Sequence, residues 1–112
     1  MSDCLFCKIV AGEIPSSKVY EDDVCYAVND IDPQARTHFL VVPKAHIGSV
    51  SEITADNSTV VAHIFEVIAK LTKEKGLDSY RVVSNIGEQA GQSVFHLHFH
   101  VLSGRDMTWP PG

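Results

Sequence analysis

The sequence of 112 residues is poor in cysteine, in basic residues and in long apolar segments. Its 3 cysteines are an odd number, which argues against a disulfide framework and is typical of a reducing compartment. With 9 Lys and Arg against 14 Asp and Glu, the net charge is −5, and no run of basic residues occurs. This balance disfavours binding to nucleic acid polymers, although local backbone donors can still hold a single nucleotide.

No apolar run approaches the roughly 20 residues that a membrane span needs. The first residues contain neither a basic region nor an apolar signal segment. We therefore expect a cytoplasmic protein with no membrane partner. The composition, 45% hydrophobic and 21% charged, is ordinary for a globular protein, and no internal repeat or low-complexity tract occurs. At this length we expect residues 1–112 to form one domain with a single modest core.

Three histidines alternate with apolar residues in the segment Phe95–Leu102. In an extended strand, His96, His98 and His100 would share one face, and the apolar residues, Phe95 included, would share the other. Same-face neighbours on a strand lie about 6.6–6.8 Å apart, so the three rings cannot all close on one ion without a bulge or sharp twist. We therefore expect divided roles, in which one end binds a metal and the middle ring attacks or passes a proton. Polar decoration of a half-buried strand is the alternative, although Lys, Thr or Glu would suit it better.

Gly91-Gln92-Ser93 lies just before this row of histidines. Glycine lets the backbone approach a ligand closely, while backbone N–H, amide and hydroxyl groups can donate to phosphate oxygens. Taken alone, the tripeptide could be a plain turn before a strand. Followed by a row of imidazoles, it predicts a phosphate cradle beside a nucleophile.

The segment Gly91–Leu102 resembles the signature of the histidine-triad superfamily, His-φ-His-φ-His-φ-φ with φ apolar. It is most similar to the branch of histidine-triad nucleotide-binding proteins. Almost the whole chain shares the resemblance, through Ile14-Pro15, Tyr20–Asp23, Asp30–Ala35, Thr37–Lys44 and Trp109–Gly112. The resemblance implies a small purine nucleoside phosphoramidase and nucleotidyl hydrolase. It also implies a five-stranded antiparallel sheet that continues across a homodimer.

The expected elements are typical of an α+β fold with an antiparallel sheet, one long helix and one short helix. They are a helix over Cys4–Gly12 with Asp3 as N-cap, strands Lys18–Glu21, Val24–Asn29 and His38–Val42, a helix from Asp56 or Asn57 to Lys75, and strands Arg81–Asn85 and Val94–Leu102. We expect the last strand to be central, because its apolar face must be buried. His63 and Cys25 are expected at the surface or in the core, without a chemical role.

Cys4-Leu5-Phe6-Cys7 has zinc-knuckle spacing, but two thiolates supply only half of a tetrahedral site. His46 and His96 are the candidates to complete it, since a nucleophilic role does not need the first ring of the row. Some similar proteins hold zinc with such a set, whereas others have lost the cysteines. A redox pair or two buried thiols are the alternatives, although no strand precedes Cys4 as in the usual redox motif. We expect a structural zinc ion, because protein ligands would fill all four positions.

His98 is the expected nucleophile, since a neutral imidazole with a pKa near 6.5 can attack the α-phosphorus at cytosolic pH. Water would then hydrolyse the nucleotidyl-imidazole intermediate. By resemblance, the backbone carbonyl of His100 holds the His98 ring in one tautomer. His100 and Ser93 would face the phosphate and the leaving group, with Ser93 hydrogen-bonded to a leaving amine. His38 either supports the row from the neighbouring strand or is a satisfied core group.

The nucleoside would be held by residues that match binding positions of the family. Asp30 resembles the ribose-binding carboxylate, with a turn aspartate as the alternative. Asn85 matches a phosphate-side ligand. In similar dimers the tail with Trp109 reaches the partner's site, unless this tail is a disordered end. The residues that match the purine sandwich, or that simply form core, are Leu5, Phe6, Ile9, Ile14, Val28 and Ile31.

Three functions compete at this point. The first is a dimeric purine nucleoside phosphoramidase that needs no catalytic cofactor. The second is a hydrolase whose histidine row binds a catalytic metal ion. The third is a nucleotide-binding scaffold with negligible turnover. For each of these functions, the sequence favours neither adenine nor guanine as the bound base, because apolar pocket residues respond to ring shape more than to edge chemistry.

Overall fold

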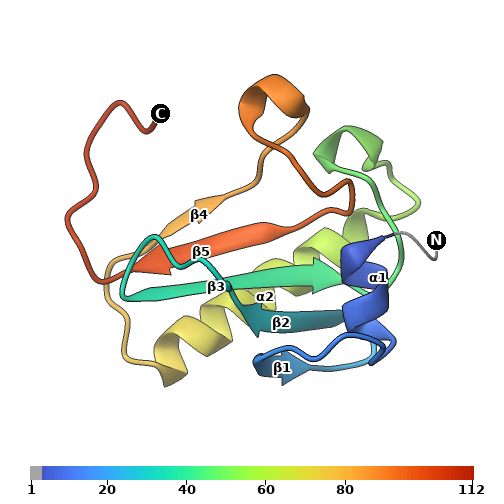
Figure 1. Ribbon diagram of the computed structural model, residues 1–112, viewed down its shortest axis with the longest axis horizontal. Coiled ribbons are helices and arrows are strands. Elements are labelled where there is room, and N and C mark those ends of the chain that lie inside the picture. Colours follow the sequence, from blue (N-terminus) through green and yellow to red (C-terminus); the bar gives the residue numbers. More distant parts are fainter. Residues whose placement is uncertain (1–3) are drawn as a thin grey trace.

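Within residues 4–112, which the computed structural model describes, one antiparallel sheet of five strands has the order β1-β2-β3-β5-β4 (Figure 1). The strands are β1 (Lys18–Glu21), β2 (Cys25–Asn29), β3 (Thr37–Pro43), β4 (Arg81–Val83) and β5 (Phe99–Ser103). Both the α+β class and the five-stranded antiparallel sheet predicted from the sequence are confirmed.

One helix covers each face of the sheet. The long helix α2 (Ser58–Glu74) packs on one face, and the short helix α1 (Leu5–Val10) lies on the other (Figure 1). Short 3₁₀ turns span Val50–Glu52 and Glu88–Ala90. In the part of the chain described, no helix is both long and apolar enough to cross a membrane.

The two faces of the sheet belong to two separate apolar clusters. Because side chains alternate along a strand, successive residues of β2 and β3 point to opposite faces. The α2 side buries Cys25, Ala27, Phe39, Val41, Ile64, Val67, Ile68, Leu71, Leu97, Phe99 and Val101, among others. The α1 side buries Phe6, Tyr26, Val28, Leu40 and Val42. Both faces of the sheet are therefore covered, and the strands have few exposed side chains.

The predicted strand over Val94–Leu102 is wrong in its first half, because regular pairing begins only at Phe99. The partner strand β3 ends at Pro43, which has no N–H to donate, so the ladder cannot continue toward Leu97. Leu97 instead donates its N–H to the carbonyl of Ile47. Phe95 is 51% exposed and does not share the buried face as predicted.

The last strand is interior, as expected from its buried apolar face. β5 lies between β3 and the edge strand β4, although β3 occupies the middle of the sheet. β4 ends at Val83 instead of Asn85. The next residue, Ser84, donates its hydroxyl to the carbonyl of His98, and this contact is not a strand ladder.

The short helix begins with Cys4 as its N-cap, whose Sγ accepts the N–H of Cys7 at 3.4 Å. Asp3, which was predicted to be the N-cap, lies outside the described residues. Gly12 follows the C-cap with a φ of +79°, a left-handed conformation that favours glycine. This end of the helix agrees with the prediction.

Asp22, in the turn between β1 and β2, joins the hairpin to α2. One carboxylate oxygen accepts the backbone N–H groups of Val24 and Cys25 at 2.8 and 2.9 Å. The other accepts the Tyr20 hydroxyl at 2.8 Å and Nε2 of His63 at 2.6 Å. Burial alone would raise the pKa of Asp22, but the hydrogen bonds outweigh it and hold this pKa well below its usual range.

Replacement of Asp22 by Asn should lower the free energy of unfolding by about 1–3 kcal/mol at pH 7, because partly buried donors lose a charged acceptor. A depressed carboxyl pKa stabilises the fold above the unfolded-state pKa of about 3.9, and this stabilisation is lost progressively as the pH falls further. The difference between the wild type and Asp22→Asn should therefore shrink below about pH 4. Denaturant unfolding at several pH values measures it, with the exposed neighbour Asp23→Asn as the control. An equal loss in both variants would contradict this role.

Candidate functional site

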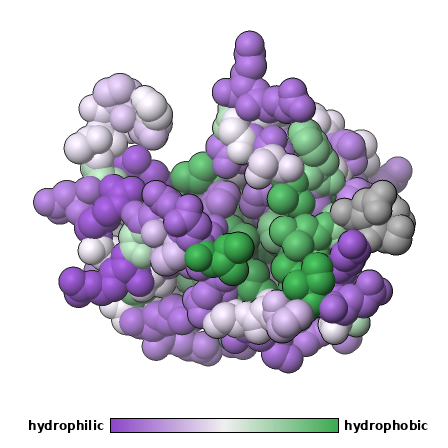
Figure 2. Space-filling model, viewed as in Figure 1, coloured by the Kyte–Doolittle hydropathy of each residue, from purple (hydrophilic) through white to green (hydrophobic). Residues whose placement is uncertain are grey.

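A cavity of about 450 Å³ opens between α1 and the sheet. In Figure 2, apolar surface gathers around a hollow on this face of the molecule. The predicted residues that line the cavity are Leu5, Phe6, Ile9, Ile14, Val28, Asp30, Ile31, Ser93, His98 and His100. The apolar positions, the acidic residue and two rings of the histidine row thus lie around one space.

The His98 ring is held by its own segment of backbone. Its Nδ1 lies 2.8 Å from the carbonyl oxygen of His96, so Nδ1 carries the proton and Nε2 carries the lone pair. Within the described residues, no hydrogen bond engages Nε2. The predicted acceptor, the carbonyl of His100, is therefore wrong. The irregular backbone before β5 lets the ring fold over the peptide that precedes it by two residues.

His38 lies behind the cavity wall, where it is hydrogen-bonded to His100 and close to Asp30. The Gln34 N–H donates to His38 Nδ1 at 3.0 Å, which leaves the proton of His38 on Nε2. That Nε2 lies 2.9 Å from His100 Nδ1 and 3.3 Å from a carboxylate oxygen of Asp30. His100 Nδ1 then accepts, and its remaining proton lies on Nε2. His38 thus contacts the histidine row directly as well as being buried.

His100 is neutral at neutral pH. Burial, followed by the charges of His98 and His38, lowers its pKa to about 4. Its Nε2–H is therefore a neutral donor on the cavity wall. Beside it, the unprotonated Nε2 of His98 is an acceptor or a nucleophile. The two rings, 5.1 Å apart between centroids, present opposite hydrogen-bonding characters to one ligand.

The Gly91-Gln92-Ser93 segment does not form the predicted cradle as a whole, since only Ser93 lines the cavity. The Gln92 side chain is buried and accepts the N–H of Gly87 at 2.9 Å. It also donates to the carbonyls of Gly48 and Val94 at 2.9 and 3.1 Å. These bonds use the amide to tie three loops together, so this side chain is not free to bind phosphate.

Asn85 and Gly91 also lie outside the cavity wall. The Asn85 side chain donates to the Ala90 carbonyl at 2.6 Å and closes the loop before Gly91. Gly91 has a φ of +93°, a value that side chains rarely tolerate, so this loop needs glycine for its shape. Both residues position the segment that leads to Ser93.

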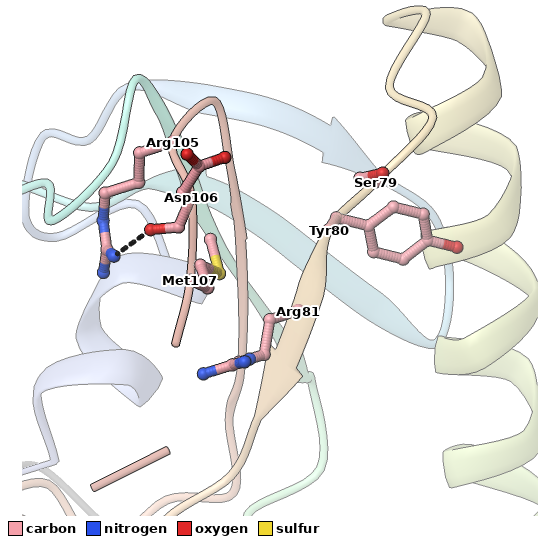
Figure 3. Close-up of a pocket in the computed structure, with 6 residues that line it drawn as sticks. All are labelled: Ser79, Tyr80, Arg81, Arg105, Asp106 and Met107. Carbon is pink, nitrogen blue, oxygen red and sulfur yellow. Dashed lines mark hydrogen bonds between the residues drawn. The ribbon is translucent and has the colours of Figure 1, made fainter. Parts of the chain in front are cut away.

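Trp109 is 82% exposed on the tail that follows β5. A smaller pocket of about 250 Å³ lies where this tail leaves the sheet, lined by Ser79, Tyr80, Arg81, Arg105, Asp106 and Met107 (Figure 3). Arg81 donates to the Thr108 carbonyl, and Arg105 donates to the carbonyls of Gln34 and Asp106. Both guanidinium groups therefore hold backbone segments in place.

Cys4, Cys7, His46 and His96 form a group that could hold a metal ion. His96 Nδ1 lies 3.3 Å from Cys4 Sγ, 3.5 Å from Cys7 Sγ and 3.2 Å from His46 Nδ1. Tetrahedral zinc with ordinary Zn–N and Zn–S bonds requires about 3.3–3.6 Å between such ligand atoms. These four residues therefore fit zinc.

His96 is prepared for this role by its second nitrogen. Its Nε2–H donates to the Pro43 carbonyl at 2.8 Å, which leaves Nδ1 without a proton, as a metal ligand requires. The ring is fully buried, and burial lowers its pKa. The backbone carbonyl of Pro43, at the end of β3, thus supplies an anchor that the sequence pattern does not reveal.

Ser84 and the rim residues Ser16, Ser17 and Asn29 were not predicted. Ser84 holds the carbonyl of His98 at 2.9 Å, and the other three line the cavity near Asp30. Their signal in the sequence is weak, because Ser and Asn are common in turns. Only the position of Ser84 just after a strand that pairs with β5 could have suggested its contact.

The comparisons with known proteins identify the family. The family model described as "Scavenger mRNA decapping enzyme C-term binding" matches residues 3–109. An uncharacterized HIT-like protein of Synechococcus elongatus is 44% identical over 111 residues, which cover 98% of this chain and 97% of that protein. The chain belongs to the histidine-triad (HIT) family.

Two solved structures extend this agreement to the fold. The HIT family hydrolase from Legionella pneumophila is 47% identical, with a TM-score of 0.95 over 98% of this chain and 100% of that one. The histidine triad nucleotide-binding protein from Candida albicans is 37% identical, with a TM-score of 0.85 over 98% of this chain and 85% of that one.

The metal group predicts one zinc ion per chain after reconstitution, measured by elemental analysis. Cys7→Ser and His46→Gln should each lose most of the bound zinc, because a tetrahedral site with three protein ligands binds more weakly and opens to water. Cobalt substitution should show thiolate-to-metal absorption bands in the wild type. His63→Gln, which changes a histidine outside the group, should keep full occupancy. A wild-type protein that remains metal-free would contradict the assignment.

Proposed function

We propose that this protein is a hydrolase that cleaves the P–N or P–O bond at the α-phosphate of a purine nucleotide conjugate. The Legionella relative is described as a hydrolase and the Candida relative as nucleotide-binding, which supports this class. The observation that carries the proposal is the His98 ring on the cavity wall. Its Nδ1 is fixed by a backbone carbonyl, and its Nε2 is unengaged within residues 4–112.

The cavity suits a nucleoside monophosphate. Its volume of about 450 Å³ falls in the range of small-molecule sites, and its walls are mostly apolar. Leu5, Phe6, Ile9 and Val28 supply flat or branched apolar surface for a purine. Asp30 is the acceptor for the ribose hydroxyls, and the histidine rings lie where the phosphate follows.

In the proposed reaction, the lone pair on His98 Nε2 attacks the α-phosphorus, and the bond from phosphorus to the leaving nitrogen or oxygen breaks. The leaving group takes up a proton from solvent at the rim of the cavity, and a nucleotidyl-imidazole forms on His98. Water then attacks the phosphorus and gives up a proton to solvent, the bond to Nε2 breaks, and the nucleoside monophosphate is released. The hydrogen bond from Nδ1–H of His98 to the His96 carbonyl stabilises the positive charge of the substituted ring.

His100 and Ser93 act on the oxygens and on the leaving group. The neutral Nε2–H of His100 donates to a phosphate oxygen, backed by His38 through Nδ1. Ser93 lies exposed at the rim, where its hydroxyl donates to or accepts from the leaving amine. The residues proposed as catalytic are thus His98, His100, Ser93 and His38.

His98→Ala should reduce hydrolysis of a fluorogenic adenosine phosphoramidate on the order of a thousand-fold or more, because no other group replaces the nucleophile. Rapid quench and mass spectrometry should detect a nucleotidyl adduct on the wild type and none on the variant. His63→Ala removes a histidine distant from the cavity lining and should keep most of the activity. A His98→Ala variant that retains more than a few per cent of the rate would contradict this role.

The runner-up is a nucleotide-binding scaffold with negligible turnover, which the description of the Candida relative also fits. Tight binding of adenosine monophosphate, with neither hydrolysis nor adduct, would favour it over the hydrolase.

A catalytic metal on the histidine row fits less well. His96 Nδ1 belongs to the thiolate group and not to the cavity. Asp30, His38 and His100 lie close enough together to share an ion. However, His38 Nε2 and His100 Nδ1 are 2.9 Å apart, a hydrogen-bond distance that is shorter than two nitrogens on one tetrahedral ion require. Chelation should therefore not abolish the chemical step itself.

Asp30 should determine the preference for ribose over deoxyribose. Asp30→Ala should lower kcat/KM for an adenosine conjugate about ten-fold or more and lower it less for the 2′-deoxy analogue, since the former loses hydrogen bonds from two hydroxyls and the latter from one. The measurement is a comparison of the two substrates on each variant. Asp32→Ala, an exposed neighbour in the same loop, is the control. An equal loss of kcat/KM for both substrates would mean that Asp30 only stabilises the loop and does not bind the sugar.

We further propose that residues 1–112 act as one cytoplasmic domain with a structural zinc ion, within a homodimer. The edge position of β4 supports the dimer, since an edge strand offers unpaired backbone groups to a second copy. Tyr80 and Ile86, which flank β4 in the sequence, add exposed apolar surface, and the exposed Phe95 lines a pocket together with Ile86. In such a dimer Trp109 would reach the partner's cavity, and light scattering in solution tests the assembly.

A further inference from the structure

The short helix α1 has little stability of its own. It has six residues, fewer than an isolated helix needs for stability in water. Of these residues only Phe6 is buried. Its own packing on the β2–β3 surface therefore consists of one buried anchor, Phe6, in the cluster with Tyr26, Val28, Leu40 and Val42, and of the partly buried Ile9 and Val10 that pack against this cluster.

This same helix forms one wall of the cavity. Leu5, Phe6 and Ile9 line it opposite the strand residues. The Phe6 ring lies 5.0 Å from the ring of His98 and 5.9 Å from that of His96, between centroids. Any shift of α1 therefore changes both the apolar slot and the packing against the proposed nucleophile.

The second attachment of α1 is the group of metal ligands. Cys4 is the N-cap and Cys7 lies in the first turn, so both thiols belong to the helix end. His46 follows β3, and His96 precedes β5. An ion bound by these four residues would join the helix to the two segments that flank the centre of the sheet.

His96 extends this link to the reacting ring. Its side chain is a metal ligand in the fitted group, and its carbonyl accepts Nδ1–H of His98 at 2.8 Å. The position of the His96 ring and that of its peptide group are set together, because they belong to one residue. The metal group and the cavity therefore share α1 on one side and His96 on the other.

We propose that metal binding to Cys4, Cys7, His46 and His96 fixes α1 against the sheet and so completes the nucleotide cavity. Metal and nucleotide then bind with positive coupling, each strengthening the other by the same factor. The inference rests on the proposed function in that the ligand of the cavity is a nucleotide. It assigns the metal a role in regulating affinity, apart from the chemical step.

The local part of this inference is tested without any nucleotide. Lys8 lies within α1, so limited trypsin digestion at Lys8 reports opening of this helix. Cleavage there should be at least about ten-fold faster in chelated protein than in zinc-loaded protein, since cleavage follows the population of the open form. Hydrogen exchange in α2 and β3 should stay slow in both, which separates release of α1 from global unfolding.

The coupling is tested by titration calorimetry with adenosine monophosphate. Zinc-loaded wild type should bind it about ten-fold more tightly than chelated wild type. In the converse titration, saturating nucleotide should raise the zinc affinity by the same factor, measured against a chelating indicator. His46→Gln removes a ligand without changing α1 or the cavity wall, so it should behave as the chelated protein does.

Asp30→Ala provides the opposite control. It should weaken nucleotide binding, while zinc-dependent protection of Lys8 in the free protein stays unchanged. Equal cleavage at Lys8 with and without zinc, or equal nucleotide affinity in both states, would overturn the coupling. Zinc-loaded protein that protects Lys8 but binds no nucleotide would instead overturn the proposed function, and with it the choice of ligand.

Discussion

The arrangement of the site depends on His96, a fully buried residue with three separate contacts. Its Nε2–H donates to the Pro43 carbonyl, its Nδ1 faces two thiols and His46, and its own carbonyl holds the ring of His98. Removal of any one of these contacts would leave a buried polar group without a partner, which costs far more than a surface contact. The backbone around His96 is irregular, and these contacts define its conformation in place of a strand ladder.

The two faces of the sheet have different roles: one stabilises the fold, and the other carries the candidate site. The α2 face is a continuous apolar core, to which Asp22 adds a hydrogen-bonded link between hairpin and helix. The opposite face carries a smaller cluster, and the remaining area is occupied by imidazoles and the cavity. Polar residues can therefore accumulate on the second face, because the first supplies most of the buried apolar surface.

Local patterns in the sequence predicted much of this structure. The 3.6-residue period located α2 to within a residue or two, since the buried residues of an amphipathic helix recur in the sequence with the period of the helix. The hairpin and β3 were likewise close to prediction. The composition of the metal group followed from the cysteine spacing and from His46 and His96, which the structure brings together.

The predictions from the sequence were wrong where a contact with a distant segment determines the local structure. Alternation predicted a strand from Val94, but Pro43 ends the partner strand, and no local signal at Val94 reports this. The side chain of Gln92 was expected at phosphate and instead ties three loops, a role that depends on carbonyls far along the chain. The acceptor for His98 differed for the same reason, because the bend before β5 is a tertiary effect.

Trp109 is the single tryptophan of the chain and is 82% exposed. The intrinsic fluorescence of the protein therefore originates from the C-terminal tail and not from the core. Emission of the single chain should be red-shifted, as for an indole in water, even while the fold is intact, whereas insertion of Trp109 into a partner's cavity in the proposed dimer should shift it to the blue. Spectral changes would then follow the surroundings of the tail, and unfolding of the sheet would be nearly invisible in this signal.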